Sequence, residues 1–400
     1  MAAGCPSRAA RPHLELADIF RAHQDRLGPL NSVQKQAASA ITSCRTAALG
    51  GHVQECDHCG HREIQYNSCR NRHCPKCGGL DKAKWVQARR ADVLPVEYHH
   101  VVFTVPQELH PLFLANPKVA INLLFAAVSE TLREVALNPK RLGARIGFTA
   151  VLHTWTQKLL YHPHLHVIVP GGGLSPKGDR WISAKPGFFL PVKVLSLVFR
   201  GKFLSMLEAA SKAGRLAGTS KEAQPLLAQA SMKSWVVYSK PPVAGPDQVL
   251  DYLGRYTHRI AISNERLVSL ENGQVTFRWK DRAHANEEKL LTLEAQEFLR
   301  RFLLHVLPRN LVRIRHYGLL ANAVRRREIT RCRLLLGEPK EEVIPSAPGS
   351  KAESWQELLL RLTGRDVTRC PKCAEGRLHE IGTIEPAGIG RRVLGRGTAS

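Results

Sequence analysis

Two pairs of cysteines with Cys-x-x-Cys spacing most constrain how the amino-terminal part of this chain can fold. Cys56 and Cys59 form the first pair, and Cys74 and Cys77 form the second a short way further along. Each pair brings two thiolates of one tight turn to a common zinc ion, and two such turns complete a tetrahedral shell without an open position. A closed site of this kind stabilises a fold and leaves no place for a substrate. The sequence therefore predicts a structural zinc ion bound by these four cysteines.

Other cysteines and histidines leave a second zinc ion open. Four of them lie close to the two turns: Cys44, His52, Cys69 and His73. Another pair, Cys370 and Cys373, occurs near the carboxyl end, and His379 and Cys332 are its possible partners. The first residues include no basic segment followed by an apolar run, and no apolar stretch is long enough to span a bilayer. We therefore expect a cytosolic protein whose clustered cysteines bind metal and do not form disulfides.

The chain is strongly basic. It has 58 Lys and Arg residues against 34 Asp and Glu, which gives a net charge of +24 over 400 residues. The charge is spread over the whole length, so it favours an extended anionic partner such as nucleic acid over a membrane-docking patch. A genome rich in arginine codons would give the same composition without such a partner. The length is typical of two or three domains with a sizeable core.

A histidine pair lies on a predicted strand. After Pro163 polar and apolar residues alternate, so that His164 and His166 point to one face of a strand over residues 164–169. Two such imidazoles can hold one divalent ion, although they can also form a hydrogen-bonded rim. The preceding strand, 146–157, offers His153 or Gln157 as a third ligand. Three ligands would leave positions open for water and phosphate, as a catalytic Mg²⁺ or Mn²⁺ site requires.

The remaining pattern predicts an α+β fold. Residues 14–48 have a helical pattern at the amino end, and further helices are expected over residues 116–137 and 293–307. Strands are expected at 97–106, 146–157, 164–169 and 235–238, with a hairpin at 266–279 that turns at Asn272-Gly273. Neighbouring strands joined mainly by hairpins indicate an antiparallel sheet.

Two tyrosines lie four residues apart on a predicted helix. Tyr252 and Tyr256 therefore share one face, together with apolar residues that would suit a buried core. The nearby Arg255, His258 and Arg259 favour a phosphate-binding surface instead.

These motifs resemble those of a known family, the HUH rolling-circle transposases of bacterial insertion sequences, the two-tyrosine group distantly related to the helitrons. The resemblance covers most of the chain. The motifs that carry it occur in the family's order: Cys56 to Cys59, Ser68 to Cys77, His162 to His166, Gly171 to Gly173, Tyr252 to Ser263 and Arg313 to Gly318.

The resemblance implies an antiparallel-sheet HUH nuclease core with an amino-terminal Cys-rich zinc module and a helical, basic carboxy-terminal region. It implies that His164 and His166 are the metal-binding pair and that Tyr256 is a nucleophile. Tyr252 is either a second nucleophile or a packing residue, since some members of the wider group keep only the other tyrosine. Related replication initiators place a glutamate or glutamine upstream of the pair at the spacing of Gln157, which favours Gln157 as the third ligand.

The implied activity is nicking and rejoining of single-stranded DNA through a 5′-phosphotyrosine, without a nucleotide cofactor. The same resemblance implies structural Zn²⁺ and a catalytic Mg²⁺ or Mn²⁺ as cofactors, and element-end DNA as the partner. It also implies a location in the bacterial cytoplasm, associated with the nucleoid. The alternatives are a plasmid replication initiator or relaxase with the same chemistry, and a non-enzymatic zinc-ribbon regulator. The arginines expected to contact DNA are Arg70, Arg72, Arg255, Arg259, Arg313 and Arg315.

Four segments are expected. Residues 1–94 form a helical lead and zinc-binding DNA-contact domain, and 95–285 form the nuclease domain. Residues 286–337 form a basic helical extension, and 338–400 form a linker and a carboxy-terminal tail with the last cysteine pair.

Overall fold

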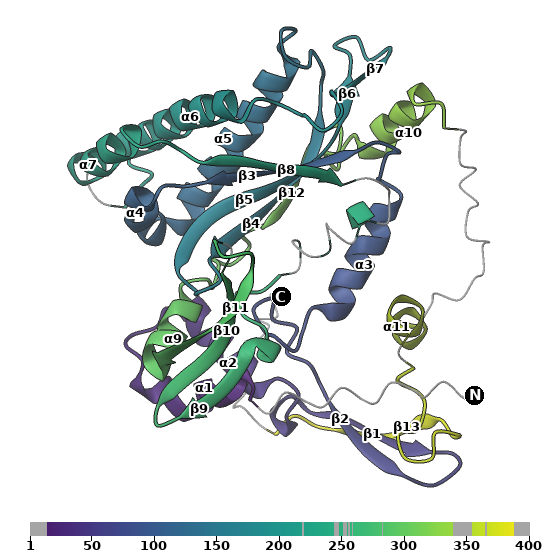
Figure 1. The fold of residues 1–400 in the computed structure, drawn as a ribbon. Coiled ribbons are helices and arrows are strands. Elements are labelled where there is room, and N and C mark those ends of the chain that lie inside the picture. Colours follow the sequence, from purple (N-terminus) through teal and green to yellow (C-terminus); the bar gives the residue numbers. More distant parts are fainter. Residues whose placement is uncertain are drawn as a thin grey trace, which may run out of the picture.

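A five-stranded antiparallel sheet forms the centre of the molecule (Figure 1). The computed structural model describes residues 14–217, 220–243, 248–250, 254, 257, 259–281, 283–338, 354–364 and 366–387. In spatial order the strands of the central sheet are β12 (Ile314–Gly318), β4 (Gly147–Trp155), β5 (Tyr161–Pro170), β3 (Tyr98–Thr104) and β8 (Val237–Val243). All neighbouring pairs are antiparallel, which confirms the predicted α+β class.

Helices cover one face of the central sheet (Figure 1). They are α4 (His110–Ala115), α5 (Pro117–Leu137), α6 (Val192–Lys212) and α7 (Ser220–Ser231). Leu165, Val167 and Val169 of β5 are fully buried in the core on this side, beside Phe125 and Phe199 of the helices. Because side chains alternate along a strand, the even-numbered residues of β5 face the other way.

The opposite face of the sheet carries the histidines and is partly covered by α3 (Gly79–Arg90). The described helical residues 248–250 also lie on this face, where Val249 and Leu250 pack with Ile168 of β5 and Tyr98 of β3. This helical segment therefore lies against the same side of β5 as the histidine pair.

A second core joins the amino-terminal helices to a three-stranded meander and the helix that follows it. It is built from α1 (Leu16–His23), α2 (Ser32–Ser43), the meander β9 (Leu267–Glu271), β10 (Gln274–Asp281) and β11 (Glu287–Glu294), and α9 (Ala295–Leu303). The ring of Phe20 in α1 meets that of Phe302 in α9 edge to face, with centroids 5.8 Å apart. The predicted hairpin turn is confirmed, because Asn272 and Gly273 both have positive φ, at 50° and 76°.

A third sheet brings the amino- and carboxy-terminal parts of the chain together. Its order is β13-β1-β2, with β1 (Gly51–Cys56), β2 (Arg62–Tyr66) and β13 (Leu378–Ile384). The hairpin β6 (Gly172–Leu174) and β7 (Trp181–Ser183) and the helices α10 (Arg325–Leu335) and α11 (Trp355–Thr363) complete the larger elements described. Among the described residues, no helix is both long enough and apolar enough to cross a membrane.

The packing crosses the expected segment boundaries. The helical stretch expected at 14–48 consists mainly of α1 and α2, which pack on α9 from the expected basic extension. The same extension contributes β12 to the edge of the central sheet. Segments 1–94 and 286–337 therefore share cores with the nuclease sheet and its meander.

Candidate functional site

Three histidines meet on the open face of the central sheet. The Nε2 atoms of His164 and His166 lie 3.1 Å apart. His153 of β4 is paired with His164 across the two strands, and one ring nitrogen from each of the three lies within 4.8 Å of the others. Ligand nitrogens about 2.1 Å from one ion are separated by about 3.0 to 3.4 Å. The spacing of the His164 and His166 nitrogens therefore fits a pair of metal ligands.

Neighbouring groups orient the two rings of the pair. The Nδ1 atom of His164 lies 2.7 Å from the carbonyl oxygen of His162, and the Nδ1 atom of His166 lies 2.8 Å from Nε2 of His100. An Nδ1–H that donates to such a partner leaves Nε2 as the ligand atom. Hydrogen bonds at Nδ1 thus direct both Nε2 atoms to a common point.

Burial keeps the His166 imidazole in the form that binds metal. His166 is 5% exposed, and its pKa is well below the usual value because of burial and then the neighbouring His153 and His164. A neutral ring presents a lone pair that a protonated ring lacks. The donor set of three imidazole nitrogens suits a transition-metal ion better than Mg²⁺, which prefers oxygen ligands.

Gln157 does not share the position of His153. β4 ends at Trp155, and Gln157 lies in the following turn, where its carbonyl oxygen accepts a hydrogen bond from Arg266. His153 stays within the strand, and Trp155 stacks on its ring with centroids 4.6 Å apart. Of the two open choices for a third ligand, the strand register brings His153 to the pair.

Both tyrosines expected as nucleophiles, Tyr252 and Tyr256, lie outside the described residues, as does Arg255. Residues 248–250 and Gly254, close to the tyrosines in the sequence, are described. A Cβ atom on Gly254 would stand 3.1 Å from Lys82 and Val86 of α3. Gly254 therefore lies beside α3, and Val249 and Leu250 pack on Ile168 of the histidine face.

The cysteines divide differently from the prediction, and this corrects the predicted zinc site. Cys74 and Cys77 group with Cys44 and Cys69, whereas Cys56 and Cys59 group with the carboxy-terminal pair Cys370 and Cys373. The turn with Cys56 and Cys59 connects β1 to β2, and both strands belong to the sheet that β13 completes. This turn is therefore separate from the one with Cys74 and Cys77. Neither His52 nor His73 joins a cluster: His52 lies 2.9 Å from Glu380, and His73 accepts from the backbone N–H of Leu307.

The first cluster has the geometry of a four-sulfur zinc site. The Sγ atoms of Cys44 and Cys77 are 3.5 Å apart, and those of Cys69 and Cys77 are 3.6 Å apart. Zinc–sulfur bonds of 2.3 Å in a tetrahedron place sulfurs about 3.8 Å apart. The backbone N–H of Cys69 donates to the Cys44 sulfur at 3.5 Å, as expected for a thiolate ligand. The cluster is packed in the second core beside α1 and α2.

The arginines expected to contact DNA have different environments. Arg72 donates to the carbonyl oxygens of Leu311 and Pro308, and Arg313 donates to that of Arg259. Burial lowers the pKa of Arg313 to about 10. Arg72 and Arg313 therefore hold the zinc-bearing part, the 307–311 loop and the tyrosine segment together. Arg70 is exposed.

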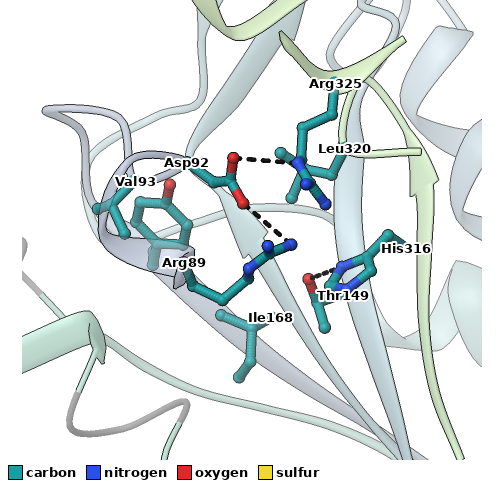
Figure 2. A pocket seen from close by; sticks show the side chains of 9 residues that line it. Arg89, Asp92, Val93, Thr149, Ile168, His316, Leu320 and Arg325 are labelled. Atoms are coloured by element: carbon teal, nitrogen blue, oxygen red, sulfur yellow. Dashed lines mark hydrogen bonds and ion pairs between the residues drawn. The ribbon is translucent and has the colours of Figure 1, made fainter. Parts of the chain in front are cut away.

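A small cavity lies further along the histidine face (Figure 2). Asp92 is held by Arg89 and Arg325, each at 3.1 Å, and Thr149 of β4 is bonded to His316 of β12 at 2.9 Å. The cavity measures about 20 Å³, which is enough for one water molecule and too little for a nucleotide. The two ion pairs of Asp92 join the end of α3 to the start of α10 beside this cavity.

A larger groove lies beside β12. Its volume is about 440 Å³, and its polar lining residues are Lys118, Asn122, Asn310, Arg315, His316 and Asn322. Ile314 in the groove pairs with Val151 of β4, which pairs in turn with His166. Strands are spaced about 4.8 Å apart, so the backbone of Ile314 lies about 10 Å from that of His166. Lys118 and Asn122 belong to α5, so this part of the groove lies on the helix-covered side of the sheet edge.

Comparisons with known proteins agree with this arrangement. Residues 147–328, which include the histidine-bearing strands, match the family described as "Putative transposase". Residues 16–105, which include the first cysteine cluster, match the "Transposase zinc-binding domain". No solved structure matches the chain.

Two curated relatives are similar over most of their length. The chain is 50% identical to "Putative transposase y4qJ" of Sinorhizobium fredii over 385 residues, which cover 93% of this chain and 96% of the relative. It is 28% identical to the "Transposase for insertion sequence element IS801" of Pseudomonas savastanoi pv. phaseolicola over 338 residues, 80% of this chain and 78% of the relative.

The fold, the site and these matches define the class of the protein as a DNA transposase. The chain belongs to the family of insertion-sequence transposases that join a transposase domain to a transposase zinc-binding domain. It is therefore an enzyme of DNA transposition with structural zinc, and Cys44, Cys69, Cys74 and Cys77 are suited to bind that ion.

Two features of the site were not predicted from the sequence. His100 contacts His166 from β3, and the only sequence signal was its place in an alternating strand. The pairing of Cys56 and Cys59 with Cys370 and Cys373 had no local signal.

Proposed function

We propose that this transposase nicks and rejoins single-stranded DNA at the ends of its element through a 5′-phosphotyrosine formed by Tyr256, as in rolling-circle transposition. The observation that carries the proposal is the convergence of His153, His164 and His166 on one face of the sheet. Val249 and Leu250, which shortly precede the two tyrosines in the sequence, support it, because they pack on Ile168, two residues beyond His166.

In this proposal His164, His166 and His153 bind one divalent ion, with His153 in place of Gln157. When bound, the ion would polarise the scissile phosphate and stabilise charge on its oxygens. The donor set favours Mn²⁺ or a similar transition-metal ion over Mg²⁺. Hydrogen bonds from Nδ1 of His164 to the carbonyl oxygen of His162 and from Nδ1 of His166 to His100 fix the two rings, so the site would be formed before DNA arrives.

The protein's own nucleophile does the covalent step. The phenolate oxygen of Tyr256 attacks the scissile phosphorus, the phosphorus–O3′ bond breaks, and the DNA 3′-oxygen takes up a proton. Attack by a DNA 3′-hydroxyl on the phosphotyrosine reverses these changes and rejoins the strand, so no nucleotide cofactor is needed. Tyr252 would serve a second cleavage while the first end stays bound.

The groove beside β12 supports a path for the DNA strand. Lys118 and Arg315 supply charge for phosphates, and the amides of Asn122, Asn310 and Asn322 supply donors and acceptors for bases. The guanidinium of Arg315 lies over the Phe125 ring at 4.0 Å and donates to Asn122 at 2.6 Å. These two contacts hold the Arg315 side chain in place in the groove before DNA binds.

The same chemistry would serve a replication initiator or relaxase, and the matches to transposases favour transposition. A non-enzymatic zinc-ribbon regulator would have no use for the three buried histidines.

Tyr256→Phe and Tyr252→Phe variants test the proposal. Single-stranded element-end DNA is incubated with the protein and Mn²⁺, and covalent adducts are separated on denaturing gels. We expect an adduct with the wild type, none with Tyr256→Phe, and single but not paired cleavage with Tyr252→Phe. Tyr66→Phe, on an exposed strand of the third sheet, is the control and keeps full activity. Absence of any wild-type adduct, or an adduct that survives in the Tyr252→Phe and Tyr256→Phe double variant, would overturn the proposal.

A further inference from the structure

Two Cys-x-x-Cys turns from opposite ends of the sequence face each other beside the third sheet. The sulfurs of Cys56 and Cys373 are 3.7 Å apart, and those of Cys59 and Cys370 are 3.8 Å apart. All four sulfurs lie within 4.8 Å of one another. The expected edge of a zinc–sulfur tetrahedron is about 3.8 Å. The matched zinc-binding range, 16–105, contains only the first of the two turns.

The two turns have the same backbone form. The N–H of Gly60 donates to the carbonyl of Cys56, and the N–H of Ala374 donates to that of Cys370, both at 3.1 Å. The residue after each second cysteine has positive φ, 65° at Gly60 and 57° at Ala374. Alanine adopts this conformation at a cost of about 1 kcal/mol or more, so the surroundings of Ala374 must impose it.

Backbone amides also point at the sulfurs. The N–H of Lys372 donates to the Cys370 sulfur, and that of Gly376 donates to the Cys373 sulfur, both at 3.4 Å. Such bonds stabilise a thiolate, which is the form that binds metal.

The two ends of the chain fit each other closely around these sulfurs. β13 pairs with β1 from Gly51 to Cys56. A Cβ atom on Gly376 would stand 2.6 Å from both the Asp57 carboxylate and the His58 side chain, so only glycine fits there. Asp57 accepts from the backbone N–H of Arg377 at 2.7 Å. The carboxy-terminal turn is thus built into the amino-terminal sheet.

We propose that Cys56, Cys59, Cys370 and Cys373 bind a second structural zinc ion, which joins the carboxy-terminal tail of one chain to its amino-terminal hairpin. Four sulfurs fill the coordination shell, so this ion stabilises the fold and takes no substrate. The distances between sulfurs of facing turns exceed the 2.05 Å of a disulfide bond.

The ion has a structural consequence. Without it, β13 loses its anchor next to Cys56, and release of β13 exposes the backbone groups of β1 as an open sheet edge. Loss of the ion would therefore expose the buried Cys56 thiol and the free edge together.

Zinc content of the full-length protein tests the proposal. We expect the Cys370→Ser/Cys373→Ser variant to contain one zinc ion per chain fewer than the wild type by elemental analysis. The Cys69→Ser/Cys74→Ser variant should lose a different ion, so the two losses add when combined. Cys332→Ser, which alters a buried thiol in a separate apolar cluster, is the control and keeps the wild-type content. Wild-type zinc content in the Cys370→Ser/Cys373→Ser variant would overturn the proposal.

Cysteine alkylation of the wild-type protein, read by mass spectrometry, does not depend on any variant folding. We expect Cys56, Cys59, Cys370 and Cys373 to resist alkylation until a chelator is added and then to react together. Reaction of Cys370 and Cys373 before chelation, or a disulfide found between them without reductant, would contradict the zinc site.

A mixing experiment tests whether one chain supplies all four ligands. The Cys56→Ser/Cys59→Ser variant is mixed with the Cys370→Ser/Cys373→Ser variant under conditions that allow refolding. We expect the mixture to have the mean zinc content of its two parts. Recovery of the missing zinc would mean that two chains share the site.

Discussion

At the residue scale, the histidine site depends on hydrogen bonds at the far side of each ring. His166 is bonded through Nδ1 to His100, and His164 is bonded through Nδ1 to the carbonyl of His162. His153 is fixed differently, by stacking on Trp155. Each ring therefore has one side that orients it and one nitrogen that faces the others.

His153→Ala and Gln157→Ala separate the two candidates for the third ligand. We expect His153→Ala to lower Mn²⁺-dependent adduct formation by about 10-fold or more, since even outer-shell partners of metal ligands contribute 10- to 100-fold. Gln157→Ala should change it by less than about 2-fold, because Gln157 uses its backbone carbonyl in the turn. Initial rates measured over a range of Mn²⁺ concentrations distinguish weaker metal binding from a slower reaction. Equal losses in both variants would contradict the assignment of His153.

At the element scale, β12 connects the sheet to the groove and to α10. The strand ends at Gly318, whose φ is 58° and whose added Cβ would stand 1.9 Å from the carbonyl oxygen of Ile146. No side chain fits between the two backbones. This close approach lets β12 complete the sheet edge on which Arg315 and His316 are placed.

Gly318→Ala should therefore loosen the edge strand. We expect the free energy of unfolding to fall by about 1 to 3 kcal/mol, because the new Cβ meets backbone and the conformation is strained. Gly201→Ala is the matched control: Gly201 is exposed on α6 with no heavy atom within 4 Å of its added Cβ. That change should stabilise the protein by up to about 1 kcal/mol. Urea unfolding followed by circular dichroism measures both, and equal effects would refute the role of Gly318.

A second element, the end of β4 with the loop that follows it, is held by His305, two residues after α9. The His305 ring lies 3.1 Å from the carbonyl oxygen of Leu159 and 3.3 Å from the Thr154 hydroxyl. Burial lowers the pKa of His305 to about 4, from about 6.5 in an unfolded chain. The folded state therefore favours the neutral ring.

This lowered pKa predicts a dependence of stability on pH. The contribution of neutral His305 to the free energy of unfolding is complete above about pH 6.5. It is lost as the pH falls from about 6.5 to about 4, because the unfolded chain binds the proton more readily than the folded one. The loss amounts to about 3 kcal/mol at most. In His305→Gln, which cannot titrate, the free energy of unfolding should fall less steeply over this range. His284→Gln, at an exposed site, should keep the wild-type slope. An unchanged slope in His305→Gln would contradict the prediction.

At the scale of the whole molecule, the net charge of +24 is distributed over parts that share two cores. Some arginines hold these parts together, as Arg72 does through three backbone carbonyls. Others, such as Arg70, are exposed. The two kinds should affect DNA binding differently.

Binding of single-stranded DNA should weaken steeply with salt. The logarithm of the association constant falls by about 0.7 per phosphate contact for each tenfold rise in salt, so six contacts would cost about 300-fold between about 50 and about 200 mM. Arg70→Gln should lower this slope by about one contact and leave stability unchanged. Arg72→Gln should instead lower the free energy of unfolding. Fluorescence anisotropy with a labelled oligonucleotide measures the slope, and a value near zero would exclude an electrostatic DNA surface.

The sequence alone determined the features that depend on local pattern. Alternation set the two faces of β5, and the Asn272-Gly273 pair set the hairpin turn, because both follow from backbone geometry over a few residues. The cysteine spacing likewise determined that each turn can offer two thiolates to an ion.

Only the tertiary structure decided which distant groups meet. Cys56 and Cys59 join Cys370 and Cys373 because β13 returns to pair with β1, and no local pattern encodes that return. His153 stands beside His164 because β4 and β5 pair in one register, whereas the resemblance to replication initiators favoured Gln157. Long-range partners depend on strand register and on the path of the whole chain, and these are set by the packing of the cores.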